Sequence, residues 1–189
     1  MFNSIISKLA PLLLLLALAM PARAEVFFSV RDLLGGQFEH SDHVTFVTVH
    51  PTAEQRRDIE QRLGHALAKP EYTFYVATTA GRVDGYALFD EERGQHEPIT
   101  FATFFDAAGH VTRVEIVAYR EPYGDAIRGQ RFRKQFVGRD AHSGFTPNAD
   151  IDAVSGATIS STSMCVGVRR ASVLLEETVL KSKTVLAAR

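Results

Sequence analysis

Residues 152–164 read Asp152-Ala153-Val154-Ser155-Gly156-Ala157-Thr158-Ile159-Ser160-Ser161-Thr162-Ser163-Met164. From the end of this stretch onward, apolar residues recur at spacings of three or four, which predicts one buried face of an α-helix. They are Met164, Val168, Ala171, Leu175 and Val179. Because Ser and Thr hydroxyls satisfy the free N–H groups of a first helical turn, we expect the helix to begin near Ser160 or Ser161.

The start of this helix is suited to an anion. Free N–H groups and the positive end of the helix dipole favour a phosphate there. Gly156 and Ala157 let a bulky anion approach the backbone, and Thr158 places a hydroxyl beside it. Taken alone, the stretch is equally consistent with a capped loop that enters a helix and binds nothing.

The preceding sequence predicts an antiparallel sheet. Segments rich in β-branched and aromatic residues are expected to form strands. They are 44–49, 72–79, 83–89, 99–105 and 111–119. The last four pair into two hairpins through turns at 80–81 and 106–109. Because one face of 111–119 is mostly apolar, we expect the sheet to pack against helices on one side, in a single α+β domain.

A helix is also predicted between the first two strands. It opens at Pro51-Thr52, and its apolar positions Ile59, Leu63 and Leu67 lie four residues apart. Gly64 should weaken this helix and Pro70 should end it.

Residues 1–24 have the features of a secretory signal. Lys8 precedes an apolar run, and Ala22-Arg23-Ala24 forms an Ala-x-Ala cleavage site. We expect cleavage after Ala24 and a periplasmic or otherwise exported protein. The alternative is an uncleaved membrane anchor, although the apolar run of about 12 residues is shorter than the roughly 20 that span a bilayer.

Composition excludes several classes of protein. Without Lys8 and Arg23, the mature chain has 19 basic and 22 acidic residues, which argues against nucleic-acid binding. Cys165 is the only cysteine, so an intrachain disulfide and a Cys-x-x-Cys-His haem site are excluded, and a small buried side chain is its expected role. His40 and His43 resemble a metal pair, but no further ligand lies at a telling distance, and we expect no metal site.

The motif Asp152-x-x-Ser155-Gly156-Ala157-Thr158 resembles the Asp-x-x-Ser/Thr-Gly-Ala-Thr signature of the FMN-binding domain family. Members include flavinylated subunits of the Rnf complex and of the sodium-translocating NADH:quinone reductase. The resemblance implies that a flavin transferase moves FMN from FAD onto the Thr158 hydroxyl, leaving a covalent phosphoester. We expect the loop and the helix start to form the cofactor site. Its residues are Asp152, Ser155, Gly156, Ala157, Thr158, Ser160 and Ser161.

A second resemblance lies in the middle of the chain. The segments in question are Gly94-x-His96-x-Pro98-Ile99-Thr100, then Tyr119-Arg120-Glu121-Pro122-Tyr123-Gly124, then Gln135-Phe136-x-Gly138. Their order is similar to that of the family's own motifs before the attachment loop. The resemblance implies that 119–124 covers one side of the flavin ring, so we expect Glu121 and Gly124 at the cofactor site. Tyr123 stands where the respiratory subunits tend to have Gly, which points to the small exported branch.

The expected organisation is a signal peptide at 1–24, an N-terminal strand and helix extension at 25–70, and an FMN-binding domain at 71–180. A further helix is expected at 126–136, and it carries a run of basic residues: Arg128, Arg131, Arg133 and Lys134. Such a run is usually a solvated face, but contact with an acidic redox partner or a flavin phosphate stays open.

These features favour an exported electron carrier with covalent FMN. It would take electrons from a membrane-bound donor, with membrane association left open, and pass them to an extracytoplasmic acceptor. No nucleophile–base pair is visible, and we expect no catalytic residue of its own. Two alternatives remain: a small flavin-dependent reductase with its own substrate, and a flavin-free binding module of the same fold.

Overall fold

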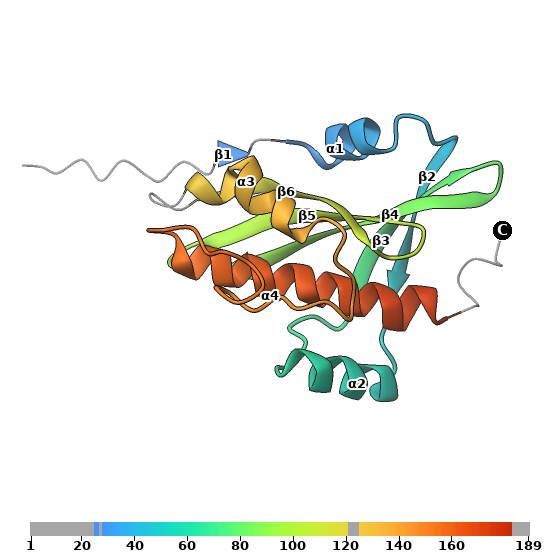
Figure 1. The fold of residues 1–189 in the computed structure, drawn as a ribbon. Helices are drawn as coiled ribbons and strands as arrows, with labels where there is room; N and C mark the ends of the chain where they lie inside the picture. The colour runs from blue at the N-terminus through green and yellow to red at the C-terminus, as the bar shows by residue number, and fades with distance from the viewer. Residues whose placement is uncertain (1–24, 27, 121–124, 183–189) are drawn as a thin grey trace, which may run out of the picture.

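The computed structural model describes residues 25–26, 28–120 and 125–182 (Figure 1). The predicted signal segment 1–24 and the predicted site residues Glu121 and Gly124 therefore lie outside the described residues.

An antiparallel sheet forms the centre of the molecule. Within the described residues it has six strands in the order β1-β6-β5-β4-β3-β2, and all neighbours are antiparallel. The strands are β1 (Glu25–Val26), β2 (His43–Val49), β3 (Tyr72–Thr79), β4 (Arg82–Arg93), β5 (Pro98–Asp106) and β6 (Val111–Tyr119). The five predicted strands and the α+β class are confirmed. β1 was not predicted, because two residues carry no periodic pattern.

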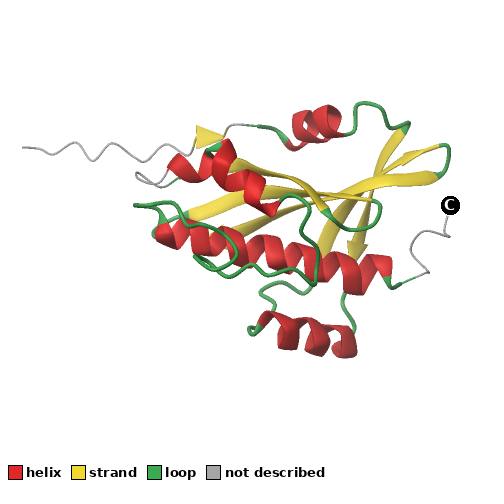
Figure 2. Ribbon diagram, in the orientation of Figure 1, coloured by secondary structure: helices red, strands yellow, loops and turns green. Residues whose placement is uncertain are grey.

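One face of the sheet is covered by the C-terminal helix α4 (Thr158–Leu175), which continues into a π-helical turn, η3 (Glu176–Leu180). Figure 2 shows this helix running along the sheet. The predicted apolar stripe is confirmed as its buried face, since each of its five residues is at most 1% exposed. No helix in the described part of the chain is long and apolar enough to cross a membrane.

The helix α2 (Ala53–Leu63) packs against α4. Its first turn is closed by a capping box in which Thr52 and Gln55 each bond the other's backbone N–H. The helix ends earlier than the sequence predicts. Gly64 adopts a left-handed conformation with φ of 80° and caps the C-terminus, so this glycine terminates the helix and Pro70 plays no part in ending it.

The opposite face of the sheet carries the helix α1 (Val30–Gln37). Leu33 and Leu34 pack there with Ala87, Ala102 and Phe104 in a second, smaller core. The expectation of helices on one side only was therefore wrong. The helix contains Gly35 and Gly36, which disfavour helix formation, and burial of the two leucines stabilises it.

The sequence predicts one continuous helix over 126–136, but the structure divides this basic segment into three short helices. It consists of η1 (Asp125–Arg128), α3 (Gln130–Arg133) and η2 (Lys134–Phe136). Gly129 has ψ of 135°, outside the helical range, and it separates η1 from α3. Ile127, Phe132 and Phe136 are buried and attach the segment to the same core as α4.

Candidate functional site

The loop of residues 152–157 leads directly into α4. It contains a turn in which the Ala157 N–H donates to the Val154 carbonyl at 2.9 Å. Gly156 has φ of +78°, a left-handed conformation that glycine adopts without strain. A Cβ built there would meet no atom within 4 Å. The backbone conformation, and not crowding, is what favours glycine at this position.

Ser161 holds both ends of this turn. Its Oγ accepts a hydrogen bond from the Val154 N–H at 3.0 Å and donates to the Ala157 carbonyl at 2.9 Å. The side chain is fully buried. Because buried polar groups must be paired, this hydroxyl fixes the turn to the first turn of the helix.

The beginning of the loop is held by two other segments. The Gln135 side chain bonds both the N–H and the carbonyl of Asp152. The Asn148 Oδ1 accepts a hydrogen bond from the Ala153 N–H at 3.3 Å. The loop is therefore bonded along most of its length to residues that lie outside it.

Two further motif regions meet the start of α4. The Ser160 Oγ lies 3.1 Å from the Tyr119 hydroxyl, in a buried contact with the end of β6. The Ser163 Oγ donates to the Arg93 carbonyl at 2.6 Å, next to the turn that the Gly94 N–H closes on the Glu97 carbonyl at 2.9 Å. Sequence segments that are far apart thus converge at the N-terminal end of α4, the end near α3 in Figure 1.

Thr158 is the first residue of α4, and its side chain is exposed. The helix begins two residues before the expected Ser160, with Ala157 at the N-cap and no side-chain cap. The expectation that serine hydroxyls satisfy the first-turn N–H groups was therefore wrong, because Ser160 and Ser161 point into the protein. Among the described residues, none forms a side-chain hydrogen bond with the Thr158 hydroxyl, so the hydroxyl is accessible.

A cavity of about 380 Å³ lies between the basic segment and the loop. Its lining residues are Ala126, Gly129, Arg131, Phe132, Gln135, Asp152, Ala153, Val154 and Ser155. The volume is within the range of small-molecule sites, about 300–1,000 Å³. Its walls combine apolar groups with one basic, one acidic and one amide side chain, which is the mixture that orients a largely apolar ligand.

The predicted site residues divide into two groups. Asp152, Ser155, Gly156 and Thr158 are exposed on the surface, whereas Ala157, Ser160 and Ser161 are buried. The prediction that all of them contact a cofactor stays a prediction. Sequence reasoning missed the contact of Gln135 with the loop, and the family-like Gln-Phe-x-Gly segment was the only signal of it.

The thiol of Cys165 does not line this cavity. Burial raises the pKa of the Cys165 thiol to about 11, and the side chain is only 2% exposed. Within the part of the chain that the structure describes, no three His, Cys, Asp or Glu residues are grouped so as to hold a metal ion.

Comparison with known families gives one match. The model of the FMN-binding domain matches residues 94–173. The matched range begins at the turn between β4 and β5 and ends within α4, so it includes the cavity, the loop and Thr158. No match is found among curated proteins.

Proposed function

Because residues 94–173 belong to the FMN-binding domain family, we propose that the protein is an exported electron-transfer flavoprotein that carries FMN covalently on Thr158. FMN binding follows from the family. The phosphoester bond, the export and the electron relay are the proposal. It rests on one observation above the others, which is the accessible Thr158 hydroxyl at the uncapped start of α4.

The residues present fit the cofactor. The free N–H groups of the first turn of α4 suit a phosphate on Thr158. Phe132 and Val154 give the neighbouring cavity apolar walls against which a flavin ring is shielded from water. The loop that joins cavity and hydroxyl is positioned by Gln135 and Ser161, so the protein can hold and orient the group.

The attachment needs a second protein, a flavin transferase, with FAD as donor. The Thr158 Oγ forms a bond to the phosphorus of the FMN half, the diphosphate bond of FAD breaks, AMP leaves, and the hydroxyl proton is released. When bound, FMN accepts electrons in pairs and releases them singly. A covalent bond would keep the cofactor on an exported protein, where free FMN is lost by dilution. A membrane-bound donor and an extracytoplasmic acceptor complete the proposed relay.

The test is the mass of the denatured mature protein after expression with its signal and a flavin transferase. We expect a gain of one FMN less water, located on the peptide that contains Thr158. Thr158→Ala should abolish the gain with little change in fold, because the side chain is exposed and makes no side-chain bond among the described residues. Thr158→Ser keeps a hydroxyl and is the matched control. Flavin that stays bound to denatured Thr158→Ala would place the bond elsewhere.

A further inference from the structure

Arg131 differs from two neighbouring basic residues, Arg133 and Arg139. It lines the cavity and is exposed, and among the described residues it forms no ion pair or side-chain hydrogen bond. Arg133 instead pairs with Glu115 at 2.7 Å and donates to the Val114 carbonyl. Arg139 donates to backbone carbonyls of the loop that follows it. Among the described residues that line the cavity, Arg131 alone carries a positive charge.

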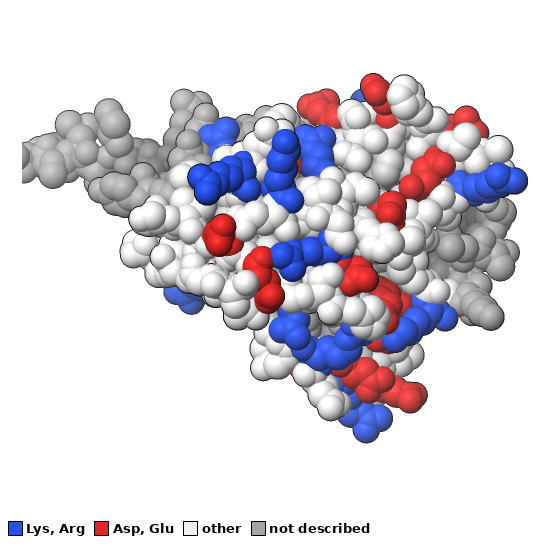
Figure 3. All heavy atoms as spheres, in the orientation of Figure 1, with Lys and Arg blue, Asp and Glu red and all other residues white. Residues whose placement is uncertain are grey.

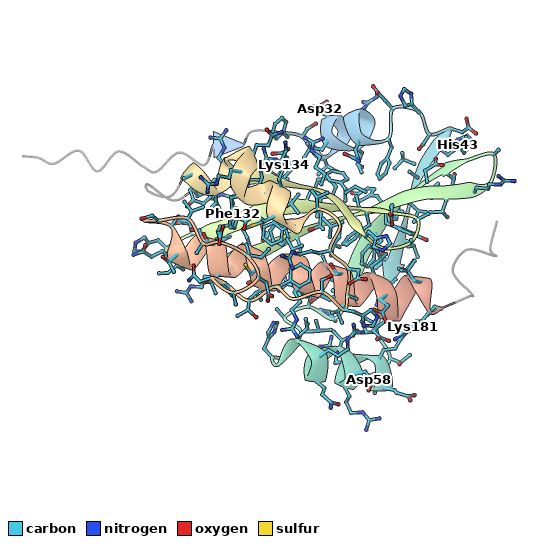
Figure 4. The ribbon with its side chains drawn as sticks, viewed as in Figure 1. Asp32, His43, Asp58, Phe132, Lys134 and Lys181 are labelled. Atoms are coloured by element: carbon cyan, nitrogen blue, oxygen red, sulfur yellow. The ribbon has the colours of Figure 1, made fainter. Side chains whose placement is uncertain are left out.

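Lys134 provides the comparison within the same segment. It is exposed like Arg131 but does not line the cavity. Figure 4 shows Phe132 on the side of α3 toward α4 and Lys134 on the outer side, and Figure 3 shows Lys and Arg side chains gathered over this region. Both residues therefore contribute to the positive charge of this region, but of the two only Arg131 lines the cavity.

We infer that Arg131 binds an anionic part of the flavin held in this cavity, an inference that rests on the proposed function. A guanidinium presents a planar fork of donors that matches phosphate oxygens and paired ring acceptors. Such a group also stabilises negative charge that develops on a cofactor. Two parts of FMN have this chemistry: the phosphate, which is always charged, and the ring, which gains negative charge on reduction.

The experiment compares Arg131→Gln with Lys134→Gln, which removes the same charge from an exposed residue of the same segment that does not line the cavity. The mature chain made without a transferase is titrated with FMN and with riboflavin, and the transferase-loaded protein is titrated for its reduction potential. We expect Arg131→Gln to weaken FMN binding about tenfold and Lys134→Gln to leave it within about twofold. Melting temperatures show whether each variant is folded.

The two ligands distinguish the two anionic groups. If the phosphate is the partner, Arg131→Gln binds riboflavin like the wild type. If the ring is the partner, riboflavin binding also weakens and the reduction potential of the loaded variant falls. The inference is overturned if both variants lose FMN affinity equally, or if Arg131→Gln matches the wild type in binding and reduction potential. Either result leaves the proposed function standing. A wild-type protein that takes up no flavin by either route overturns the proposed function together with the inference.

Discussion

The side-chain amide of Gln135 pairs with both backbone groups of Asp152. The Gln135 Oε1 accepts from the Asp152 N–H at 2.8 Å, and the Gln135 Nε2 donates to the Asp152 carbonyl at 3.2 Å. The amide thus bonds the loop backbone as a neighbouring strand would. It connects the basic segment, which lines one side of the cavity from Ala126 to Gln135, to the loop that lines the other side, so the width of the cavity depends on this contact.

Gln135→Leu should loosen the loop, because it removes both hydrogen bonds while keeping a similar volume. Each such bond contributes about 1 kcal/mol net, and we expect faster hydrogen exchange at the amides of 152–154 with only a small change in melting temperature. Gln130→Leu is the control, since Gln130 is exposed and forms no side-chain hydrogen bond among the described residues. Equal exchange in the Gln135 variant and the wild type would show that the amide does not hold the loop.

Gly156→Val should destabilise the loop through its backbone. A residue with a Cβ pays about 1–2 kcal/mol for a left-handed conformation, and a β-branched residue more, whereas the space around a Cβ is open. We expect reduced covalent flavin loading and a lower free energy of unfolding, both measured on the same sample. Gly156→Asn should lose much less, because Asn tolerates this region. If Val and Asn behave alike, the positive φ is not what the position requires.

Sequence reasoning succeeded where one element carries its own pattern. The apolar stripe of α4 reflects burial of a single helix and is confirmed. Strand β6 was located correctly, but its residues from Val114 to Tyr119 are all buried instead of alternating, because Val117 packs on the second face in the core that includes α1. Sequence reasoning failed where a segment depends on distant partners. The α1 helix is stabilised by Leu33 and Leu34 packing on β4 and β5, and the segment that is divided at Gly129 buries Phe132 and Phe136 in the core.

In the candidate site, too, features that depend on local sequence were expected and features that depend on distant residues were not. The accessible hydroxyl of Thr158 was expected from the motif, because the motif is local. The inward direction of Ser160 and Ser161 was not expected, because it depends on Tyr119, 41 residues earlier than Ser160, and on the turn before the helix. The cavity wall at Arg131 and Phe132 also required the tertiary structure.

Cys165 should be unreactive in the folded protein. Burial raises the pKa of its thiol to about 11, and the thiolate is the reactive form. We expect no reaction with Ellman's reagent at pH 8 and one thiol per chain in denaturant. An exposed thiol has a pKa near 8.5, so the thiol of the unfolded chain ionises at a lower pH than that of the folded chain. The free energy of unfolding therefore falls as the pH rises from about 8.5 to about 11.

The control for this pH dependence is Cys165→Ala, which lacks the thiol. Its free energy of unfolding should fall less between pH 8 and pH 10 than that of the wild type. Rapid reaction of the native thiol, or identical pH slopes in the two proteins, would contradict the assignment of Cys165 as an inert core residue.

Asp152→Ala should lower the rate at which a flavin transferase modifies the protein while the loop keeps its position. The Asp152 carboxylate is exposed, and the contacts with Gln135 use only backbone atoms, so the substitution removes the acid without removing the anchor. Because Asp152 begins the stretch that resembles the family's attachment motif, we expect the acid to contribute to recognition by the transferase. Initial rates of flavin incorporation, followed by mass at limiting enzyme, measure the effect. Asp152→Asn is the control, because it removes the negative charge and keeps the polar shape of the side chain.

Slowing in both variants assigns the role to the carboxylate charge, whereas slowing in the alanine variant alone assigns it to the polar shape. Wild-type rates in both variants would show that the transferase does not read this side chain.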